Sequence, residues 1–564
     1  MHWLEYAFFL VVVLGLSGPV GGYLASVFEG TPSIGDRFFR PLELRLLRAI
    51  GVETTAELTA TVYTICFVAF GLAGAALLYL LMVLQHLLPL GPDASRLSTP
   101  MTPHLAANTA FSFATATTWQ AYGGETTLKY LTQLVGLVAQ NFLGAAAGLA
   151  AGMAFIRGFA RENAATIGNF WVDVVRALVR VLLPLALVGS LVLVWQGVPM
   201  NFDPYVEATT LEGGRQVIAQ GPVAALEFIK NLGTNGGGFF NVNGAHPYAN
   251  PTPLTNFLGM LGIVVIPAAL PIAFGRTVGR PNAGRLLLGI MVLLFAAGLV
   301  VCDQAESHTP WPLQSLAADG GNMEGKEVRF GVGGSVLAAV VTSNGACGSN
   351  NSMHGSFQPM GVLVLLVNMM LGEVTFGGLG TGLYSLLMVA LVGVFLGGLM
   401  VGRTPEYLGK TIGISEAKLI ALYALLTPAV ILGMTGVAIV SDGGKAAAAT
   451  NAGPRAFSEI LFAYTSCMAN NGQSMGGLNA NTPFYNLTTI VPMLAGRFGL
   501  AALALALAGR LAAQGRKDET VGTLPCDTFT FGALIVGSLL LIGALCFLPA
   551  LELGPLAEHL QSLP

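Results

Sequence analysis

Long apolar stretches alternate with short polar segments along the whole chain. A helix that crosses the hydrocarbon core of a bilayer needs about 20 predominantly apolar residues, and ten stretches fit that requirement. The pattern therefore predicts an all-α integral membrane protein with about ten transmembrane helices. The predicted spans are 6–28, 58–86, 131–156, 177–200, 252–275, 285–302, 359–401, 415–440, 487–509 and 528–550.

The seventh stretch is too long for a single crossing. It contains Glu373 and, three residues later, the run Phe376-Gly-Gly-Leu-Gly-Thr-Gly382. Glycine loses more conformational freedom in a helix than any other residue, so this run has low helix propensity. We therefore expect the seventh span to break or unwind near Glu373.

Four of the polar segments contain an apolar run of about half the length that a crossing needs. Three of these runs begin with proline, which suits the first turn of a helix, and the fourth begins near Ser335. We expect half-helices at 103–114, 222–232, 335–343 and 454–465. A small, uncharged, polar or glycine-rich stretch follows each one, beginning at Ala114, Gly233, Ser343 and Ser466.

The order span, half-helix, loop, span recurs four times, with one more span at each end of the chain. Gly236 and Gly472 lie 236 residues apart, and so do Pro247 and Pro483, which belong to two segments of the pattern x-Pro-aromatic-x-Asn. Gln120 and Gly348 are the corresponding reference positions in the first and third loops. The repeat predicts a first span with a cytoplasmic loop (1–57), four pore repeats (58–160, 161–280, 281–412 with a broken second span, and 413–515) and a last span (516–564).

Composition narrows the class of protein. Hydrophobic residues make up 54% of the chain and charged residues only 10%, whereas soluble proteins carry about 25% charged residues. The hydrophobicity also excludes an intrinsically disordered chain. A net charge of -3 leaves no basic surface for nucleic acid, so we expect membrane lipid and no nucleic acid among the partners.

Lysine and arginine favour one set of alternating segments, which holds 18 of the 26 basic residues. By the positive-inside rule this set is cytoplasmic. One such segment holds Arg37, Arg40, Arg45 and Arg48. Both termini are then expected outside the cytoplasm.

The four loops favour a particular kind of cargo. Irregular backbone at membrane depth is tolerated only where it is buried in protein or lines a wet cavity. Four such loops around one pseudosymmetry axis would direct main-chain carbonyls and the negative ends of four helix dipoles toward that axis. Because the loops contain no Asp, Glu, Lys or Arg, a dehydrated monovalent cation fits better than a divalent cation, a proton or an anion. The alternative is that the loops are only tight turns.

Several longer motifs resemble the potassium-binding A subunits of bacterial Kdp potassium-transporting ATPases. The resemblance covers nearly the whole chain, and implies a channel-like, non-catalytic subunit of the superfamily of potassium transporters in the inner membrane. It also implies a P-type ATPase B subunit, a single-span C subunit and a small F peptide as partners, with potassium as the transported ion and no prosthetic group. The motifs include Gly233-Thr-Asn-Gly-Gly-Gly-Phe-Phe-Asn241, Asn322-Met-Glu-Gly-Lys-Glu327, Gly402-Arg-Thr-Pro-Glu-Tyr-Leu-Gly-Lys410 and Gly496-Arg-Phe-Gly499.

The resemblance also implies a set of filter residues. The chain departs from the commoner family pattern at Ala116 and Thr118, which replace two asparagines, and at Gly355, which replaces an acid. We expect selectivity to survive, because main-chain carbonyls coordinate a cation whatever the side chain is, while affinity is open to change. The implied potassium-binding residues are Thr115, Ala116, Thr117, Thr118 and Gln120; Thr234, Asn235 and Gly236; Ala346, Cys347 and Gly348; and Asn470, Asn471 and Gly472.

Two charged residues fall within predicted spans, where a charge is costly and points to function. Glu373 is expected to line the cation route toward the partner subunit, and Arg497 to set a barrier against leak into the cytoplasm. The resemblance implies a gating loop and a tunnel mouth here, with Gly378, Gly380 and Arg403. The alternative for both charges is a buried ion pair or a side chain that reaches the membrane interface.

An autonomous potassium channel or symporter of the same superfamily is the competing function. A membrane enzyme is disfavoured, because the sequence has no HExxH motif. It also lacks an Asp-Lys-Thr-Gly phosphorylation motif, so ATP hydrolysis is expected on a partner.

Overall fold

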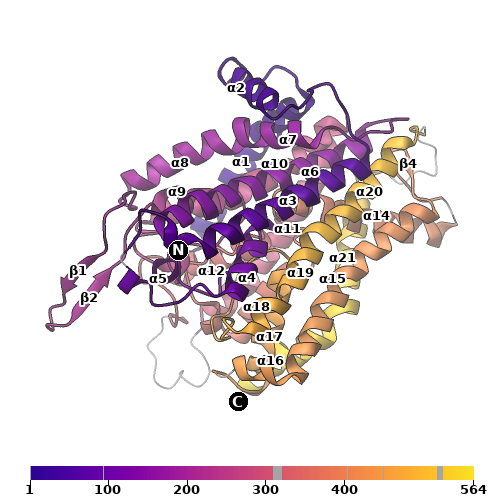
Figure 1. Cartoon of the computed structure of the whole chain (residues 1–564). Helices are drawn as coiled ribbons and strands as arrows, with labels where there is room; N and C mark the ends of the chain where they lie inside the picture. The colour runs from indigo at the N-terminus through magenta and orange to yellow at the C-terminus, as the bar shows by residue number, and fades with distance from the viewer. Residues whose placement is uncertain are drawn as a thin grey trace.

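The computed structural model describes residues 2–92, 94–308, 321–402, 404–448, 450–517 and 525–563. Within these residues, ten helical stretches are long and apolar enough to cross a membrane. The spans lie side by side as one bundle (Figure 1), and the only strands there form two short hairpins. The predicted all-α membrane fold and the predicted number of spans are confirmed.

The four repeats can be followed along the chain, with α1 (His2–Glu29) before them and α21 (Phe529–Leu551), η9 (Glu552–Leu556) and α22 (Ala557–Ser562) after them. The first repeat comprises α3 (Ala60–Val83), η1 (Gln85–Leu87), η2 (Ala94–Arg96), α4 (Pro103–Ala114), α5 (Gly124–Thr127), η3 (Thr132–Val138) and α6 (Ala139–Ala160). The second comprises α7 (Phe170–Arg176), η4 (Ala177–Leu182), α8 (Leu183–Trp195), β1 (Val206–Thr209), β2 (Arg215–Ile218), α9 (Val223–Leu232), η5 (Asn243–Ala245) and α10 (Pro253–Thr277).

The third and fourth repeats follow the same order. The third comprises α11 (Pro281–Glu306), α12 (Gly331–Asn344), η7 (His354–Ser356), α13 (Pro359–Met370), α14 (Thr381–Val401), β3 (Glu406–Tyr407) and β4 (Lys410–Thr411). The fourth comprises α15 (Ile414–Val440), α16 (Asp442–Ala447), α17 (Gly453–Met468), α18 (Pro483–Thr488), α19 (Ile490–Leu494), η8 (Ala495–Gly499) and α20 (Leu500–Ala513). The helix α2 (Asp36–Ala49) links α1 to the first repeat.

The predicted half-helices are α4, α9, α12 and α17. α4 has the predicted bounds, because the Thr102 hydroxyl accepts a hydrogen bond from the Leu105 N–H and Pro103 occupies the first turn. α12 begins four residues earlier than Ser335, at Gly331. The low helix propensity of its glycines is overridden by packing, since Gly333 lies so close to the His2 ring that a Cβ would overlap it.

The seventh span is broken, as predicted. α13 ends at Met370 and α14 begins at Thr381, and we call the ten residues between them the 371–380 linker. Glu373 and Phe376 both have positive φ there, a conformation that costs non-glycine residues energy. The linker therefore stays unwound although both flanking helices are strongly apolar.

The centre of the bundle is built from α6 and α10, whose spans are the most buried of the ten. α6 presents Gly144, Gly148 and Gly152 along one face, spaced so that another backbone can approach closely. The filter loops and the 371–380 linker occupy that space. At opposite ends of the bundle, α2 and the β1–β2 hairpin extend beyond the spans (Figure 1).

Candidate functional site

The ends of the four half-helices share one backbone conformation. Each loop has two residues of positive φ separated by a single residue. The pairs are Ala116 and Thr118, Thr234 and Gly236, Ala346 and Gly348, and Asn470 and Gly472. Each triplet is separated from the end of its helix by one residue, so its first left-handed residue ends the helix as a C-terminal cap does.

The N–H groups of these loops are used by the half-helices. The N–H of Thr117 and that of Thr118 both donate to the Ser112 carbonyl, and Asn235 and Gly236 do the same to the Lys230 carbonyl. In the third and fourth loops, Cys347 donates to Thr342 and Asn471 to Ser466. Since the N–H groups point back at the helices, the carbonyl groups are left as the polar groups that the loops can offer to a ligand.

The middle residues of the triplets form a closed ring, which we call the carbonyl ring: Thr117, Asn235, Cys347 and Asn471. Any Cβ at Gly236 would overlap the carbonyl oxygen of Cys347, one at Gly348 that of Asn471, and one at Gly472 that of Thr117. Thr118 closes the cycle, because its hydroxyl donates to the Asn235 carbonyl oxygen. Each loop thus contacts the next in chain order, which brings the four loops around one axis.

This cycle corrects the register expected for the first loop. The residue equivalent to Gly236, Gly348 and Gly472 is Thr118, two residues before Gln120. Gln120 instead links two loops, because its Oε1 accepts from the Gly238 N–H at 2.7 Å and its Nε2 donates to the Gly238 carbonyl at 3.2 Å. Because position 118 is threonine and not glycine, the sequence alone did not show that it corresponds to the glycines of the other three loops.

Side chains from the loops brace the ring from behind. Asn470 Nδ2 donates to Thr117 Oγ1 and to the Met493 carbonyl, both at 2.9 Å. Asn471 Nδ2 donates to the Thr342 carbonyl at 2.9 Å, and Cys347 Sγ lies 3.5 Å from the Lys230 carbonyl. Thr115 and Thr117 share a hydroxyl–hydroxyl hydrogen bond of 2.8 Å. The contacts of Asn470 with Thr117, of Asn471 with Thr342 and of Cys347 with Lys230 cross between repeats and hold adjacent loops together.

Behind the second loop, Lys230 and Glu227 form an ion pair for which the sequence predicted no role. Lys230 takes the half-helix position held by Ser112, Thr342 and Ser466 in the other repeats. Its Nζ lies 2.8 Å from the Glu227 carboxylate, and both side chains are buried. The signal was present in the sequence: a lysine and a glutamate three residues apart in an otherwise apolar half-helix.

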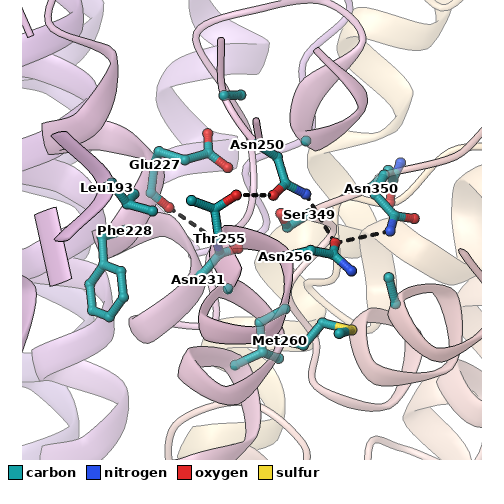
Figure 2. Close-up of a pocket in the computed structure, with 16 residues that line it drawn as sticks. Leu193, Glu227, Phe228, Asn231, Asn250, Thr255, Asn256, Met260, Ser349 and Asn350 are labelled. Atoms are coloured by element: carbon teal, nitrogen blue, oxygen red, sulfur yellow. Dashed lines mark hydrogen bonds between the residues drawn. The ribbon is translucent and has the colours of Figure 1, made fainter. Parts of the chain in front are cut away.

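A pocket between the second and third loops carries a network of amide side chains. Asn250 donates to Asn256 Oδ1 at 2.9 Å, and Asn351 donates to the same oxygen at 3.1 Å. The Thr255 hydroxyl donates to Asn250 Oδ1 at 2.7 Å (Figure 2). Glu227 and Asn231 line the same pocket, so the network joins α9, α10 and the third loop behind the ring.

A small cavity lies directly under the ring. It is lined by the first residue of every triplet, namely Ala116, Thr234, Ala346 and Asn470. The 371–380 linker forms its other side, and the Leu379 N–H donates to Thr234 Oγ1 at 3.1 Å. Glu373, Gly378, Leu379, Thr381 and Arg497 also line the cavity.

The two charges predicted to act in the membrane are thus brought together in one cavity. Glu373 is buried and lines the cavity together with Gly378 and Thr381. Arg497 is also buried, donates to the Gly144 carbonyl and lies over the Phe67 ring, with 5.7 Å from its Cζ to the ring centroid. It belongs to η8, a π-helical turn of the kind often found at functional sites.

The remaining predicted gating residues are placed differently. Gly378 lines the cavity, whereas Gly380 packs against Gly148 and Gly152 of α6. A Cβ at Gly380, whose φ is +92°, would overlap the Gly148 carbonyl. Gly380 therefore fixes the lower end of the linker. Arg403 lies outside the described residues.

Comparisons with known proteins identify a family from the sequence and a similar fold among solved structures. The sequence family described as "Potassium-transporting ATPase A subunit" matches residues 7–560. The potassium-transporting ATPase potassium-binding subunit of a strain of Methylorubrum extorquens is 51% identical over 99% of this chain and 97% of its own. That of Rhodopseudomonas palustris is 48% identical over 99% and 98%. The crystal structure of the potassium transporter TrkH from Vibrio parahaemolyticus has a similar fold, with a TM-score of 0.53 and 14% identity over 87% of this chain and 96% of its own.

Proposed function

Because the chain belongs to the family of potassium-transporting ATPase A subunits, we propose that it binds potassium in the carbonyl ring and passes the ion to an ATP-hydrolysing partner. The observation that carries the proposal is the closed cycle of contacts among the four loops. Main-chain oxygens arranged around an axis can replace the hydration shell of a monovalent cation. The subunit itself is a non-catalytic component of transport.

The electrostatics of the ring support a monovalent cation. Four half-helices end at the ring, and each contributes roughly half a negative charge from its C-terminus. No acidic or basic side chain belongs to the four triplets. A single positive charge is therefore attracted without a carboxylate that would bind a divalent ion more tightly. The filter residues are those of the four triplets together with Thr115 and Gln120, which brace them.

The cavity under the ring supports a route that turns sideways. In this proposal Glu373 attracts the ion that leaves the ring, and Arg497 repels it from the direct path to the cytoplasm. The 371–380 linker, with Gly378 and Gly380, acts as the gate. Beyond it, the ion enters a tunnel toward a P-type ATPase B subunit, in a complex completed by a single-span C subunit and a small F peptide.

The topology belongs to the same proposal. The distribution of lysine and arginine supports an orientation with both termini outside the cytoplasm, and membership of the family supports a bacterial inner-membrane location. The predicted division into four pore repeats agrees with the order of helices, although the exact boundaries stay a prediction. An autonomous potassium channel is the alternative.

The test uses the purified complex with its ATPase partner. Potassium is expected to stimulate ATP hydrolysis at a much lower concentration than sodium, because dehydration in a carbonyl ring favours one ionic size. Equal stimulation by both ions would contradict selectivity. Passive potassium flux through the isolated chain in vesicles, without the ATPase, would favour the autonomous channel.

A further inference from the structure

The helix α2 has an exposed apolar stripe beside an exposed basic face. Phe38, Leu42 and Leu46 follow one another at intervals of four residues, so they line one side of the helix, and their exposed fractions are 79%, 40% and 41%. Arg37, Arg40, Arg45 and Arg48 are exposed as well. Apolar side chains this exposed would be unusual in such number on a helix that lies wholly in water.

The inner side of α2 packs against the start of a candidate membrane span. Leu47 is fully buried against Val172, Val175 and Val179, which belong to the first ten residues of the span Phe170–Trp195. At a rise of about 1.5 Å per residue, these contacts lie within about 15 Å of the start of that span. α2 therefore lies beside the first turns of a span, at one end of the membrane bundle.

The acidic residues of α2 are used for attachment to the bundle. Glu43 pairs with Arg176 at 3.0 Å and with Arg180 at 2.6 Å, and Asp36 pairs with Arg180 at 2.6 Å. In the part of the chain that the structure describes, no ion pair is formed by the four exposed arginines of α2. The helix thus turns its carboxylates inward and a net positive charge outward.

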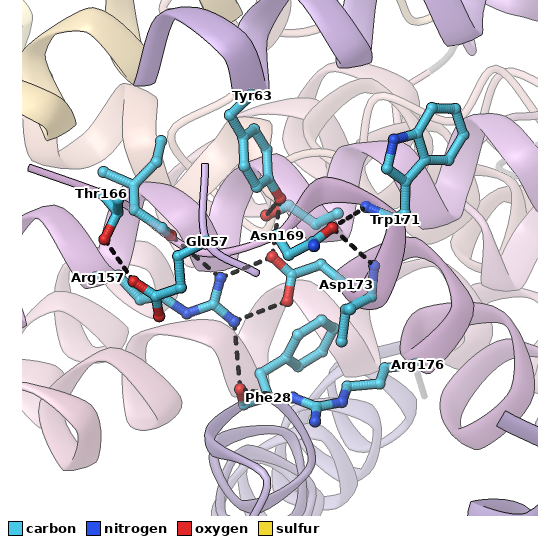
Figure 3. Close-up of polar contacts among 12 residues, drawn as sticks. Phe28, Glu57, Tyr63, Arg157, Thr166, Asn169, Trp171, Asp173 and Arg176 are labelled. Atoms are coloured by element: carbon cyan, nitrogen blue, oxygen red, sulfur yellow. Dashed lines mark hydrogen bonds and ion pairs between the residues drawn. The ribbon is translucent and has the colours of Figure 1, made fainter. Parts of the chain in front are cut away.

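The surface against which α2 packs is held together by an ion pair and hydrogen bonds between several helices. Arg157 binds both oxygens of Asp173, at 2.6 and 2.7 Å, and also donates to the Phe28 carbonyl at the end of α1 (Figure 3). The Tyr63 hydroxyl donates to Asp173 at 2.9 Å. This cluster joins α1, α3, α6 and α7, and α2 is tied to the same surface through Arg176 and Arg180. Trp171, a residue type enriched at membrane interfaces, lies beside the cluster (Figure 3).

We propose that α2 is an interfacial helix that binds anionic phospholipid in the cytoplasmic leaflet. Phe38, Leu42 and Leu46 enter the upper acyl-chain region, and the four arginines bind the phosphate groups of neighbouring lipids. An apolar stripe beside a basic face is the pattern of helices that lie in the plane of a membrane surface. A lipid surface satisfies both faces at once, and the packing of Leu47 on the first ten residues of the span keeps α2 close to the membrane surface.

The first test measures the depth of Phe38 in the assembled complex in lipid nanodiscs. A nitroxide label at Phe38→Cys is compared with one at Leu211→Cys, an apolar residue of the far β1–β2 turn that is fully exposed, after subtraction of the unsubstituted complex. We expect oxygen to reach the Phe38 label and a water-soluble nickel complex to be excluded, with the reverse at Leu211. Nickel access equal to that at Leu211 would overturn the proposal. Exclusion of both reagents would overturn it in favour of a covering protein partner.

The second test measures binding of phosphatidylglycerol by native mass spectrometry of the delipidated complex. Replacing Arg37, Arg40, Arg45 and Arg48 with glutamine should weaken the first bound lipid by about fivefold or more, since each basic residue near a membrane contributes to anionic-lipid attraction. Arg215→Gln, an exposed arginine of the β1–β2 hairpin, is the matched control and should change nothing. Equal binding by the quadruple variant would overturn the proposal, and unchanged potassium-stimulated ATP hydrolysis in detergent would show that the variant is folded.

Discussion

The carbonyl ring and the cavity below it are both polar sites inside the helix bundle, but the ring is built from main-chain carbonyls and the cavity carries charged side chains. Both are breaks in helical structure at membrane depth, where every open backbone group must find a partner. The ring has no charged side chain and consists of loops in which glycines allow carbonyl groups to touch the next loop. The cavity carries Glu373 and Arg497, both buried, and its linker holds non-glycine residues at positive φ.

The difference shows how two regions of one molecule can separately select an ion and direct its movement. A ring of main-chain oxygens recognises an ion by its size and dehydration cost, and its geometry depends on the backbone more than on any side chain. A cavity with one acid and one base directs an ion by charge, and it depends on those two side chains. Mutations should therefore affect the two regions through different quantities.

The largest expected effect is on the backbone of the ring. Gly348→Ala should lower potassium affinity by at least about tenfold, because a Cβ there overlaps the Asn471 carbonyl and a left-handed alanine costs about 1–2 kcal/mol. Cys347→Ala, one residue away, removes only a weak thiol contact and should change affinity by less than about threefold. The measurement is the potassium concentration for half-maximal ATP hydrolysis by the complex. Similar losses in both variants would refute coordination by the main chain.

The cavity charges should affect coupling more than affinity. Arg497→Met should raise the passive potassium leak of the complex in vesicles, because the positive barrier under the ring is lost. Glu373→Gln should lower potassium-stimulated ATP hydrolysis by about tenfold, since the cavity loses its attraction for the ion while keeping the shape of the side chain. Neither should shift the preference for potassium over sodium. A shifted preference would mean that the cavity, and not the ring, selects the ion.

A smaller effect is expected at Thr118, where the ring differs from its own pattern. Thr118→Val keeps the shape but loses the hydroxyl bond to Asn235, which we expect to cost about 1 kcal/mol and about fivefold in potassium affinity. Thr118→Gly restores the residue type of the other three loops and relieves the left-handed side chain, so its loss should be smaller. The same titration of ATP hydrolysis decides between them. Unchanged potassium affinity in Thr118→Val would show that the hydroxyl is not what closes the ring.

Much of the fold was predictable because membrane spans are local. The length of each apolar run, the proline at the start of three half-helices and the glycine-rich break after Glu373 act within a few residues, and the structure confirms the spans, the half-helices and the break. The start of α12 was wrong by four residues, because its glycines are held in a helix by packing against α1. The family was also predictable from the motifs.

The candidate site was predictable in its parts and not in its assembly. The second, third and fourth triplets follow from the glycines that end them, but the first was aligned on Gln120, since no glycine marks Thr118. The meeting of Glu373 with Arg497 joins positions whose separation along the chain carries no signal by itself, whereas the i,i+3 spacing of Glu227 and Lys230 could have been recognised. The functional roles of these residues remain predictions that the experiments above test.

The sequence by itself determined that the chain lies in a membrane, that it is built from four repeats and that four uncharged loops follow four half-helices. Tertiary structure decided which carbonyl meets which glycine, which residue closes the ring, and that two distant charges share one cavity. The physical reason is the distance along the chain over which each effect acts. Hydrophobicity and helix capping act over one or two turns, whereas contacts between loops more than a hundred residues apart depend on how the membrane helices pack together.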